Sequence, residues 1–569
     1  LSVIVFLNGL GTFHTDIKPE IYMRPWSMLV HYLSSWTSSP YLGSPNFNVG
    51  LVPVLAVLSG LRGIGMSPEF AFKTFHLILL LIAAFGAARL VRTLVPQASG
   101  WLALAAAVFY VANPYTISAG ATLAIALPMA FLPWMLICVA QAYKRPRSWA
   151  WPALVGISFF LMSGMNVAVV PLFSLLAIIP LTIAVWHDTG LTVKNATIVL
   201  SRSALFVVLF SLYWLVPAFL ALGTGAQIVD GSETMDGIAK VSSLPEVLRG
   251  LGLWPLYGSS SIGPWVPEHA VYLTSPFVVV VTMLWPTLGL VGLLWATTRL
   301  RLFIALSVAL SAVIMVGLFP NEASPASPFG IVLREVLSIP ALSAFRTTNK
   351  IGAVLALALA FGVAALAVYW LPKIWQFAPA RITALVLVVT LFAGWTMPAF
   401  TGGLYTSALD LPEYWDDAAA SIDKSEQPGT VLVLPGQVRA NYRWTEERPD
   451  DVLNSILDRR AVLPETTPNA SPPAVNFLAA LDSSFQSGTS AATVVSGMAR
   501  YLGAGQVLLR HDVVWENNGG ARPAQTRQQV GSDPGLFGRE NFGNNGQNVL
   551  SPAMEDPFFF GEQFLPPLQ

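Results

Sequence analysis

The chain has 569 residues and no net charge at pH 7, and 54% of its residues are hydrophobic. A mean hydropathy of +0.61 excludes an ordinary soluble globular protein. The balance of 31 basic and 31 acidic residues gives no reason to expect nucleic acid as a partner. The single cysteine, Cys138, excludes an internal disulfide and leaves no Cys/His zinc spacing.

Apolar segments recur along the first 400 residues. A spanning helix needs about 20 mostly apolar residues, and this criterion predicts about eleven spans. Residue 1 is not Met and the chain opens inside an apolar run, so we expect the first span to have begun upstream. The predicted spans are the tail at 1–10 and the segments 70–92, 100–118, 120–143, 149–164, 166–187, 197–222, 271–297, 302–319, 350–371 and 382–400.

The charges of the loops predict how these spans are oriented. Cytoplasmic loops carry an excess of Lys and Arg. If residue 11 lies outside, alternate spans end at basic residues, as this rule requires. The basic residues are Arg89, Arg92, Lys144, Arg145, Arg147, Lys194, Arg299, Arg301, Lys373 and Arg381. The apolar run 47–61 would break the alternation as a span, so we expect an interfacial or re-entrant helix there, within a first outside loop at 11–69.

The character of the chain changes after the last predicted span. Residues 1–400 form the predicted membrane domain, whereas residues 401–569 are polar, contain no spanning segment and lie outside by the same parity. Within 401–516 the pattern predicts a small α/β module built from a helix at 411–423 and buried strands at 431–434 and 506–509. Residues 517–569 are rich in Gly, Asn and Pro, which predicts an extended tail.

The first outside loop carries a cluster of ionisable residues directly after the first span: His14, Asp16, Lys18 and Glu20. Such groups at a membrane boundary are costly and often functional. Asp16 is our candidate general base, a role that partial burial favours by raising the pKa of the carboxyl group and that Lys18 opposes. The alternative is a solvated aspartate. Glu20 and His14 leave open a second acid, a metal ligand or a surface residue, since His14-x-Asp16 is too short to define a metal site.

Further along the same loop, Arg24 and Trp26 belong to a stretch of mixed basic and aromatic residues. This mixture suits stacking against a sugar. It suits equally well an interfacial helix that aromatic side chains anchor in the membrane surface.

A second constellation, Phe345-Arg346-Thr-Thr-Asn349-Lys350, lies at the outside end of a predicted span, where positive charge is not expected. Arg346 and Lys350 there would form a cradle for a lipid phosphate, with Lys73 as a weaker third cation. The alternative is snorkelling of the two side chains toward lipid headgroups. The charged loop 223–270 is expected to be a solvated cap, and Tyr442 and Trp444 to be structural or to face solvent.

Several short segments, in their order along the chain, make it resemble a known family. They are Thr15–Lys18 with Pro25-Trp26, Gly120–Trp134, Gly164–Asn166, Phe345–Lys350, Leu434–Gly436 with Tyr442-x-Trp444, and Tyr501–Ala504. The layout of an acidic first outside loop, a helical membrane body and an outside soluble domain is similar to that of C-type glycosyltransferases. The closer resemblance is to the mycobacterial and corynebacterial arabinofuranosyltransferase D family, whose members are longer, so we expect a fragment or a more distant homologue.

This resemblance implies an α-helical polytopic membrane protein with the C-type glycosyltransferase fold and an extracytoplasmic α/β module. It implies that Asp16 is the catalytic carboxylate and that Arg346 and Lys350 contact the donor phosphate. Lys18, Glu20, His14, Arg24 and Trp26 are then the candidate substrate-binding residues. Neither a metal nor another cofactor is required by the sequence, and a divalent cation stays an option.

The function that follows is an inverting glycosyltransferase of an actinobacterial plasma membrane, with its active site on the extracytoplasmic face. Its donor would resemble decaprenyl-phosphoryl arabinofuranose, and its acceptor would be the arabinan of arabinogalactan or lipoarabinomannan. Membrane lipids would be its other partners.

Three alternatives stay open. One is transfer of another polyprenyl-linked sugar, such as mannose. Another is a lipid or glycan transporter, or an assembly scaffold, although transporters usually place charges near the bilayer midplane and these charges cluster on the outside face. The third treats the module as a sugar-binding domain on a membrane anchor, which conflicts with the cations at the helix mouth.

Overall fold

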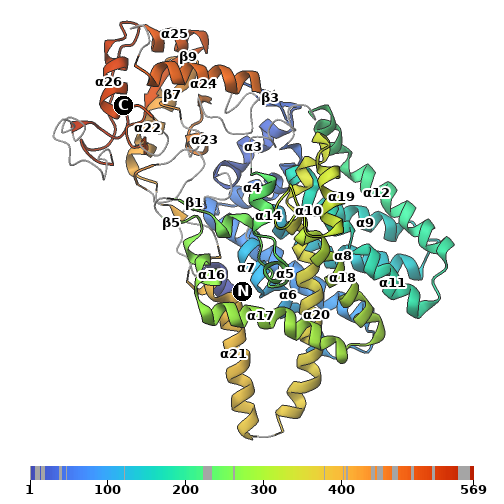
Figure 1. The fold of residues 1–569 in the computed structure, drawn as a ribbon. Coiled ribbons are helices and arrows are strands. Elements are labelled where there is room, and N and C mark those ends of the chain that lie inside the picture. Colours follow the sequence, from blue (N-terminus) through green and yellow to red (C-terminus); the bar gives the residue numbers. More distant parts are fainter. Residues whose placement is uncertain are drawn as a thin grey trace.

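The computed structural model shows a large helical body with a smaller mixed module at one end (Figure 1). It describes residues 2–6, 13–14, 19–37, 42–46, 48–120, 122–221, 233–260, 263–376, 378–401, 403–404, 408–409, 411–436, 442–444, 453–463, 472–488, 493–515, 520–548 and 564–569. The candidate base Asp16 and the neighbouring Lys18 lie outside these residues.

Within the described ranges, nine helical segments are long and apolar enough to cross a membrane. Each corresponds to one of the predicted spans, which confirms a multi-pass membrane protein. They are α5 (Pro68–Leu94), α6 with α7 (Gly100–Val111, Pro114–Ala119), α8 (Leu123–Lys144), α10 with α11 (Val169–Leu175, Ile178–Thr189), α12 (Val193–Leu220), α17 with η5 (Pro276–Val291, Gly292–Leu294), α18 (Thr298–Val316), η7 with α20 (Thr348–Ile351, Gly352–Ile374) and α21 (Ala378–Phe400).

The two other predicted spans are short in the structure. Helix α9 (Ala150–Leu161) has 12 residues, and α1 (Ser2–Phe6) contributes 5 to the described chain. The apolar run predicted to be interfacial forms η1 (Asn48–Leu51) and α4 (Val52–Gly63), which pack against α3 (Pro25–Tyr32) and α5.

The helix starts follow from local sequence. Ser67, Ser99 and Asn113 each accept a hydrogen bond from a backbone N–H of the first helical turn, at 3.4, 3.1 and 3.1 Å. These side chains satisfy amide groups that have no partner within the helix. Pro68 and Pro114 follow two of these caps, where a missing N–H costs nothing.

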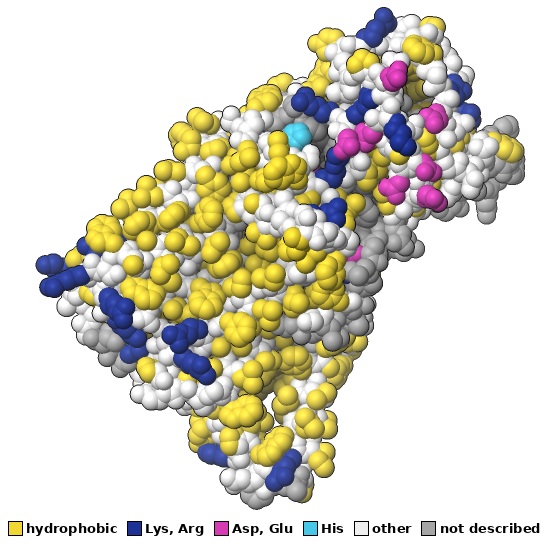
Figure 2. All heavy atoms as spheres, turned by 180° about the vertical axis from the view of Figure 1, so that it is seen from behind, with side chains coloured by type: hydrophobic (Ala, Val, Ile, Leu, Met, Phe, Trp, Pro, Cys, Tyr) yellow, Lys and Arg dark blue, Asp and Glu magenta, His cyan; other side chains and the backbone are white. Residues whose placement is uncertain are grey.

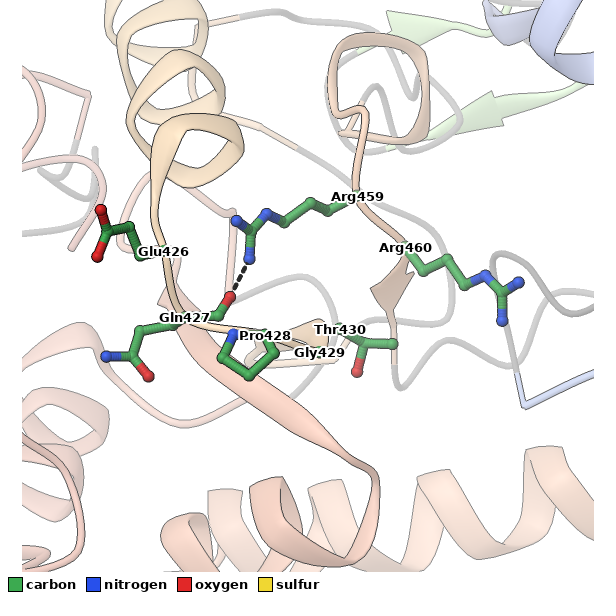
Figure 3. A pocket seen from close by; sticks show the side chains of 7 residues that line it. All are labelled: Glu426, Gln427, Pro428, Gly429, Thr430, Arg459 and Arg460. Atoms are coloured by element: carbon green, nitrogen blue, oxygen red, sulfur yellow. Dashed lines mark hydrogen bonds between the residues drawn. The ribbon is translucent and has the colours of Figure 1, made fainter.

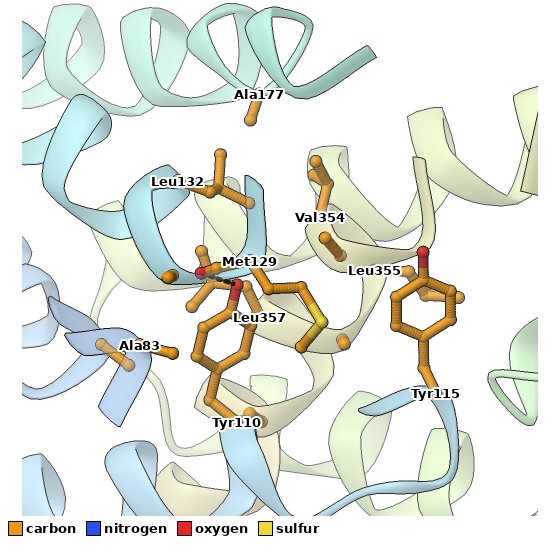
Figure 4. Close-up of a cluster of buried hydrophobic side chains, with 14 of the residues drawn as sticks. Ala83, Tyr110, Tyr115, Met129, Leu132, Ala177, Val354, Leu355 and Leu357 are labelled. Atoms are coloured by element: carbon orange, nitrogen blue, oxygen red, sulfur yellow. Dashed lines mark hydrogen bonds between the residues drawn. The ribbon is translucent and has the colours of Figure 1, made fainter. Parts of the chain in front are cut away.

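The centre of the body is built around α20. Its residues Ala353 to Phe361 are at most 1% exposed. Figure 4 shows this helix beside Tyr110, whose hydroxyl donates to the backbone carbonyl of Met129 at 2.9 Å. A Cβ atom at Gly292 would lie 1.9 Å from the carbonyl oxygen of Gly362, so small residues let the adjoining helices approach closely.

The surface of the body matches a membrane environment. Figure 2 shows hydrophobic side chains covering it, between the module at one end and a rim of Lys and Arg side chains at the other. Helix α12 contributes exposed side chains such as Leu209, which is 50% exposed. The guanidinium of Arg202, at the cytoplasmic-type basic segment that includes Arg145 and Arg147, donates to the carbonyl of Pro146 at 2.9 Å and lies 4.2 Å from the ring centroid of Trp149. Aromatic and basic side chains of this kind typically mark the level of the lipid headgroups.

Short elements connect the spans on the side of the module. The first loop holds β1 (Phe13–His14), α2 (Glu20–Met23), α3 and the hairpin of β2 (Trp36–Thr37) with β3 (Ser44–Pro45). The other loops hold η2 (Met165–Ala168), α14 (Met235–Lys240), α15 (Leu244–Leu248), η3 (Trp254–Tyr257), β4 (Ser259–Ser260), β5 (Gly263–Pro264), η4 (Pro267–Ala270), α16 (Val271–Thr274), α19 (Pro328–Leu337) and η6 (Pro340–Arg346).

The C-terminal module contains a three-stranded sheet in the order β8-β7-β9, with both pairs parallel. The predicted helix and both predicted strands are confirmed. The module comprises α22 (Glu413–Lys424), β7 (Thr430–Leu434), α23 (Leu453–Ile456), β8 (Ala461–Val462), α24 (Pro472–Gln486), α25 (Val494–Tyr501), β9 (Ala504–Leu509) and α26 (Pro523–Ser532).

The prediction of an extended tail after residue 517 is wrong in part. Residues 523–532 form α26, which packs against α24 and buries Pro523 and Thr526. The last residues lie beside β9, where the backbone N–H of Leu509 donates to the carbonyl of Gln569 at 2.8 Å. Composition alone missed this order because tertiary packing, and not local hydrophobicity, stabilises the segment.

The interior of the module contains buried ionisable groups. Asp512 is fully buried, and one of its carboxylate oxygens accepts hydrogen bonds from Tyr414, Trp415 and Trp444 at 2.8, 3.0 and 3.1 Å. Burial raises the pKa of Asp512 to about 6, and these donors and Arg510 oppose that shift. Tyr442 and Trp444 are therefore structural, as predicted.

Candidate active site

The two predicted phosphate-binding cations lie at the start of α20. Arg346 ends η6, and Lys350 lies within η7, which leads directly into α20. Pro340 occupies the first turn of η6, where its fixed φ suits the tight turn. The helical segment formed by η7 and α20 begins at Thr348, and the dipole at the start of a long helix favours an anion. The local fold therefore places two cations at a helix end that itself carries partial positive charge.

Arg346 is buried, and its guanidinium contacts described residues on all three nitrogens. Its Nε donates to the backbone carbonyl of Glu233 at 3.0 Å, and one terminal nitrogen donates to the carbonyl of Ser343 at 3.2 Å. The other terminal nitrogen lies 3.3 Å from the carboxylate of Glu233. The guanidinium plane is thus fixed before any ligand binds.

The residues between the two cations each contact a different part of the body. Thr347 donates to the carboxylate of Glu233 at 3.2 Å, and Thr348 donates to the carbonyl of Met315 at 3.3 Å. The side-chain amide of Asn349 donates to the carbonyl of Gly252 at 3.1 Å. These contacts fix the backbone from which Lys350 extends.

Two polar groups of this element have bonding capacity left. The Oδ1 atom of Asn349 is buried without a hydrogen-bond partner. The half-buried Lys350 interacts electrostatically with Glu233 and Arg346, but its ammonium makes no ion pair within 4.0 Å to a described residue. Among the described residues, one carboxylate therefore faces two cations.

The described part of the loop between α12 and α17 is not only a solvated cap, contrary to the prediction. Arg249 is 2% exposed and pairs with Glu246 at 2.5 Å, and it also donates to Thr282 and to the carbonyl of Tyr272. Tyr257 donates to the same carboxylate of Glu246. Because the Tyr257 hydroxyl also accepts from the N–H of Gly252, this network fixes the turn that Asn349 contacts.

Lys73 lies elsewhere, on the outer part of α5. Its ammonium is fully buried and lies 2.5 Å from the carboxylate of Glu69 one turn earlier. The same part of α5 packs against α2 through Phe72 and Tyr22, whose ring centroids are 5.4 Å apart. Lys73 thus has a carboxylate partner already, and its contact with a donor phosphate stays a prediction.

The structure places the first-loop candidates differently from one another. Glu20 is buried in the first turn of α2. Arg24 forms an ion pair with Asp458 of the module, and Trp26 is 68% exposed on α3. His14 lies in β1, which pairs with β6 (Ala408–Leu409). Burial lowers the pKa of Arg24, and the carboxylate of Asp423 opposes this.

Sequence reasoning missed Glu233, Arg249 and Asp458 as partners of the site. All three are charged residues of polar segments, and their partners are distant in sequence. No local pattern distinguishes them from solvated residues. Among the described residues, no group of three His, Cys, Asp or Glu side chains is placed to hold a metal ion.

A hollow of about 460 Å³ lies away from these residues, in the module (Figure 3). It is lined by 426–430 with Arg459 and Arg460. Arg459 donates to the backbone carbonyl of Gln427, whereas the side chain of Arg460 points away from this hydrogen bond. This hollow lies at the amino end of β7, whereas ligands of open parallel sheets bind at the carboxyl ends of the strands. It is not part of the candidate site.

Comparison with known proteins points to one family. The family model described as "Alpha-(1->3)-arabinofuranosyltransferase, N-terminal GT-C domain" matches residues 1–559. Two curated proteins of that name are similar to the chain. The one from Mycolicibacterium smegmatis is 26% identical over 563 residues, and the one from Mycobacterium tuberculosis is 24% identical over 575 residues. The alignments cover 95% of this chain but only 38% and 39% of these relatives.

The fold has a counterpart among solved structures. The cryo-EM structure of arabinofuranosyltransferase AftD from Mycobacteria superposes with a TM-score of 0.69 at 20% identity. That match covers 95% of this chain and 37% of the solved chain. Body and module together therefore share the architecture of the N-terminal part of a longer protein.

Proposed function

Because the chain belongs to the alpha-(1->3)-arabinofuranosyltransferase family through its N-terminal GT-C domain, we propose that it transfers arabinofuranose from a polyprenyl-phosphate donor to a cell-wall glycan. The names of the two mycobacterial relatives support the sugar and the reaction class. The acceptor, in this proposal, is a growing arabinan.

The observation that carries the proposal is the pair of cations at the start of α20. Arg346 and Lys350 face a single described carboxylate, Glu233, beside a helix N-terminus. A phosphate whose lipid tail stays in the bilayer is an anion of suitable charge for this place. Arginine offers two parallel donors to phosphate oxygens, and lysine adds a point charge.

The reaction we propose is a single displacement. Asp16 takes the proton of an acceptor hydroxyl, whose oxygen attacks the anomeric carbon of the donor sugar. The bond from that carbon to the phosphate oxygen breaks with its electron pair, so polyprenyl phosphate leaves and the anomeric configuration inverts. The leaving phosphate gains one negative charge, and Arg346 and Lys350 stabilise it as it forms.

We place the site on the extracytoplasmic face of the plasma membrane. The basic rim at the end opposite the module supports this orientation, since Lys and Arg are enriched in cytoplasmic loops (Figure 2). A lipid-linked donor then reaches the site from the outer leaflet. No divalent ion enters this scheme, and a requirement for one is open to titration with a chelator.

The test is transfer by purified protein in nanodiscs, with a panel of polyprenyl-phosphate sugars and an arabinan acceptor. Removing a general base typically costs about 10²–10⁴-fold, so Asp16→Asn should lose at least about 10²-fold in kcat. Glu335→Gln, at an exposed carboxylate of another outer loop, is the matched control. Full activity of Asp16→Asn contradicts the assignment of the base, and a preference for the mannose donor contradicts the assignment of the sugar.

A further inference from the structure

The chain just before the candidate base is tied to the C-terminal part of the protein. Strand β1 pairs antiparallel with β6, with Phe13 opposite Leu409 and His14 opposite Ala408. Strand β6 lies between the last span, α21, and the first module helix, α22. Leu411, just after β6, packs against the hydrophobic cores of both the body and the module.

The chain just after the candidate base is tied to the same module by different contacts. Helix α2 packs against α23 of the module. Arg24, at the end of α2, forms its ion pair with Asp458, which follows α23. The side chain of Arg24 is 23% exposed and that of Asp458 is 75% exposed. The carboxylate of Asp423 also interacts with Arg24 and favours its charged form.

The turn that presents Asp458 is well supported. The backbone N–H groups of Asp458 and Arg459 donate to the carboxylate of Asp423, at 2.9 and 3.1 Å for the shortest contacts. Leu453 and Leu457 anchor the preceding segment in the module core, at 0% and 3% exposure. Strand β8 follows directly and pairs with β7. The partner of Arg24 therefore sits on a rigid part of the module.

A third contact joins the two parts. Trp444 packs against the core of the body and against the core of the module. Its indole N–H donates to buried Asp512 at 3.1 Å, and the centroid of its ring lies 5.1 Å from the ring centroid of Tyr442. The indole is thus oriented from within the module while its ring contacts the body.

We propose that the module and the strand β6 that leads into it are positioning elements of the active site, which hold Phe13–His14 through β6 and Glu20–Arg24 through α23 and Asp458. Arg24 and Asp458 are then positioning residues, which act on the reaction through the segment that carries Asp16. The proposal rests on the function proposed above.

The energetics give this proposal a signature. An exposed ion pair contributes only about 0.2–1 kcal/mol to stability, so its loss leaves the protein folded. A misplacement of about 1 Å in an active site can cost about 10²-fold in rate. Loss of the pair is therefore expected to change kcat much more than it changes unfolding or the KM of the donor.

The first experiment exchanges the two charges in the nanodisc assay. Arg24→Glu and Asp458→Arg alone should each lower kcat about tenfold with little change in donor KM, and the double variant should recover most of the loss. Asp417→Arg, an exposed carboxylate on α22, is the matched control and should keep full activity. Wild-type kcat in both single variants overturns the proposal. So does failure of the double variant to recover, because Arg24 would then act on the substrate itself.

The second experiment needs no transfer activity, so it separates this proposal from the proposed function. Directly opposed residues of antiparallel strands have Cα atoms about 4.5–5.5 Å apart, within reach of a disulfide. Phe13→Cys with Leu409→Cys should oxidise rapidly, and Arg24→Glu should slow this reaction because it loosens the segment. Equal rates with and without Arg24→Glu overturn the proposal.

Discussion

Two of the clusters of buried charge among the described residues are satisfied in different ways. In the module, one carboxylate oxygen of Asp512 accepts hydrogen bonds from three uncharged donors. The two preceding residues, Arg510 and His511, are also buried. In the membrane body, Glu233 pairs with Arg346 while Lys350 keeps no ion pair among the described residues. Buried charge alone therefore does not identify a reaction site.

The difference lies in what each cluster still lacks. The module cluster balances the carboxylate of Asp512 with the guanidinium of Arg510, which also donates to the carbonyl of Pro435 at 2.6 Å, although Oδ1 of Asp512 accepts no hydrogen bond from a described residue. The body cluster holds two cations for one described carboxylate, at the start of the helical segment that continues into α20. We expect substitutions in the Asp512 cluster to act on stability, and substitutions in the body cluster to act on transfer.

The largest expected effect is on the stability of the module. Asp512→Ala leaves the donors of Tyr414, Trp415 and Trp444 without an acceptor. Each unsatisfied buried donor costs about 1–3 kcal/mol, so the module should lose on the order of 4 kcal/mol. Hydrogen exchange of the amides of β7 and β9 measures this loss, with exposed Asp417→Ala as the control. Unchanged protection of these strands would show that Asp512 is not structural.

The next effect depends on pH. Burial lowers the pKa of His511 to about 4, so its contribution to stability is lost as the pH falls from about 6.5 to 4. Burial raises the pKa of Asp512 to about 6, so stability is lost as the pH rises from about 4 to 6. In the wild-type protein the two groups change the free energy of unfolding in opposite directions as the pH falls, each by on the order of 3 kcal/mol.

Asp512→Asn removes the contribution of Asp512 to the pH dependence of stability. Its amide nitrogen can occupy the position of Oδ1, which accepts no hydrogen bond, so the three donors keep their acceptor. Only the contribution of His511 to this pH dependence then remains, so the opening free energy of the module should fall by about 3 kcal/mol from pH 6.5 to 4. Hydrogen exchange across this range measures the fall. A flat profile in the variant would contradict a destabilising protonation of His511.

In the body, Lys350→Met should act on the reaction. Removing one stabilising donor from a developing negative charge costs about 10²–10³-fold, so we expect kcat to fall at least about 10²-fold. The melting temperature should change little because the ammonium makes no ion pair with a described residue. Lys240→Met, an exposed lysine of α14, is the matched control. Transfer within threefold of wild type would remove Lys350 from the phosphate site.

The smallest expected effect is at Thr347. Thr347→Val removes the hydrogen bond of its hydroxyl to Glu233, which is worth about 1 kcal/mol, or roughly a fivefold drop in kcat/KM. Thr347→Ser keeps the hydroxyl and should stay near wild type. Steady-state kinetics with the lipid donor distinguishes the two. Equal loss in both variants would point to packing of the methyl group instead.

The sequence predicted the membrane body well because a long apolar segment has few other stable states. Every span of the described body that meets the length criterion coincides with a predicted one. The module strands at 431–434 and 506–509 were also predicted, since short β-branched and leucine-rich runs between Gly and Pro are typical of buried strands. The α26 segment was missed because its helix is stabilised by α24 and not by its own composition.

The candidate site could be predicted only in part. Arg346 and Lys350 could be selected as candidates because the loop charges predict a helix end at which cations are unusual. Lys73 met the same criterion, but its ammonium is paired with Glu69 inside the body. The ion pairs of Glu233 and Arg249 could not be predicted, because the local sequence around a charged loop residue does not show whether its side chain is solvated or buried in an ion pair.

The amino-acid sequence by itself determined the class of protein, nine of its spans and the position of the C-terminal module, and it supplied the candidate residues for the proposed phosphate site. Periodicity and hydropathy carry this information locally. Only the tertiary structure decided which charges are neutralised, such as Lys73, and which stay available, such as Lys350. It alone brought Asp458 to Arg24 and β6 to β1, because contacts between distant segments depend on packing and leave no local pattern in the chain.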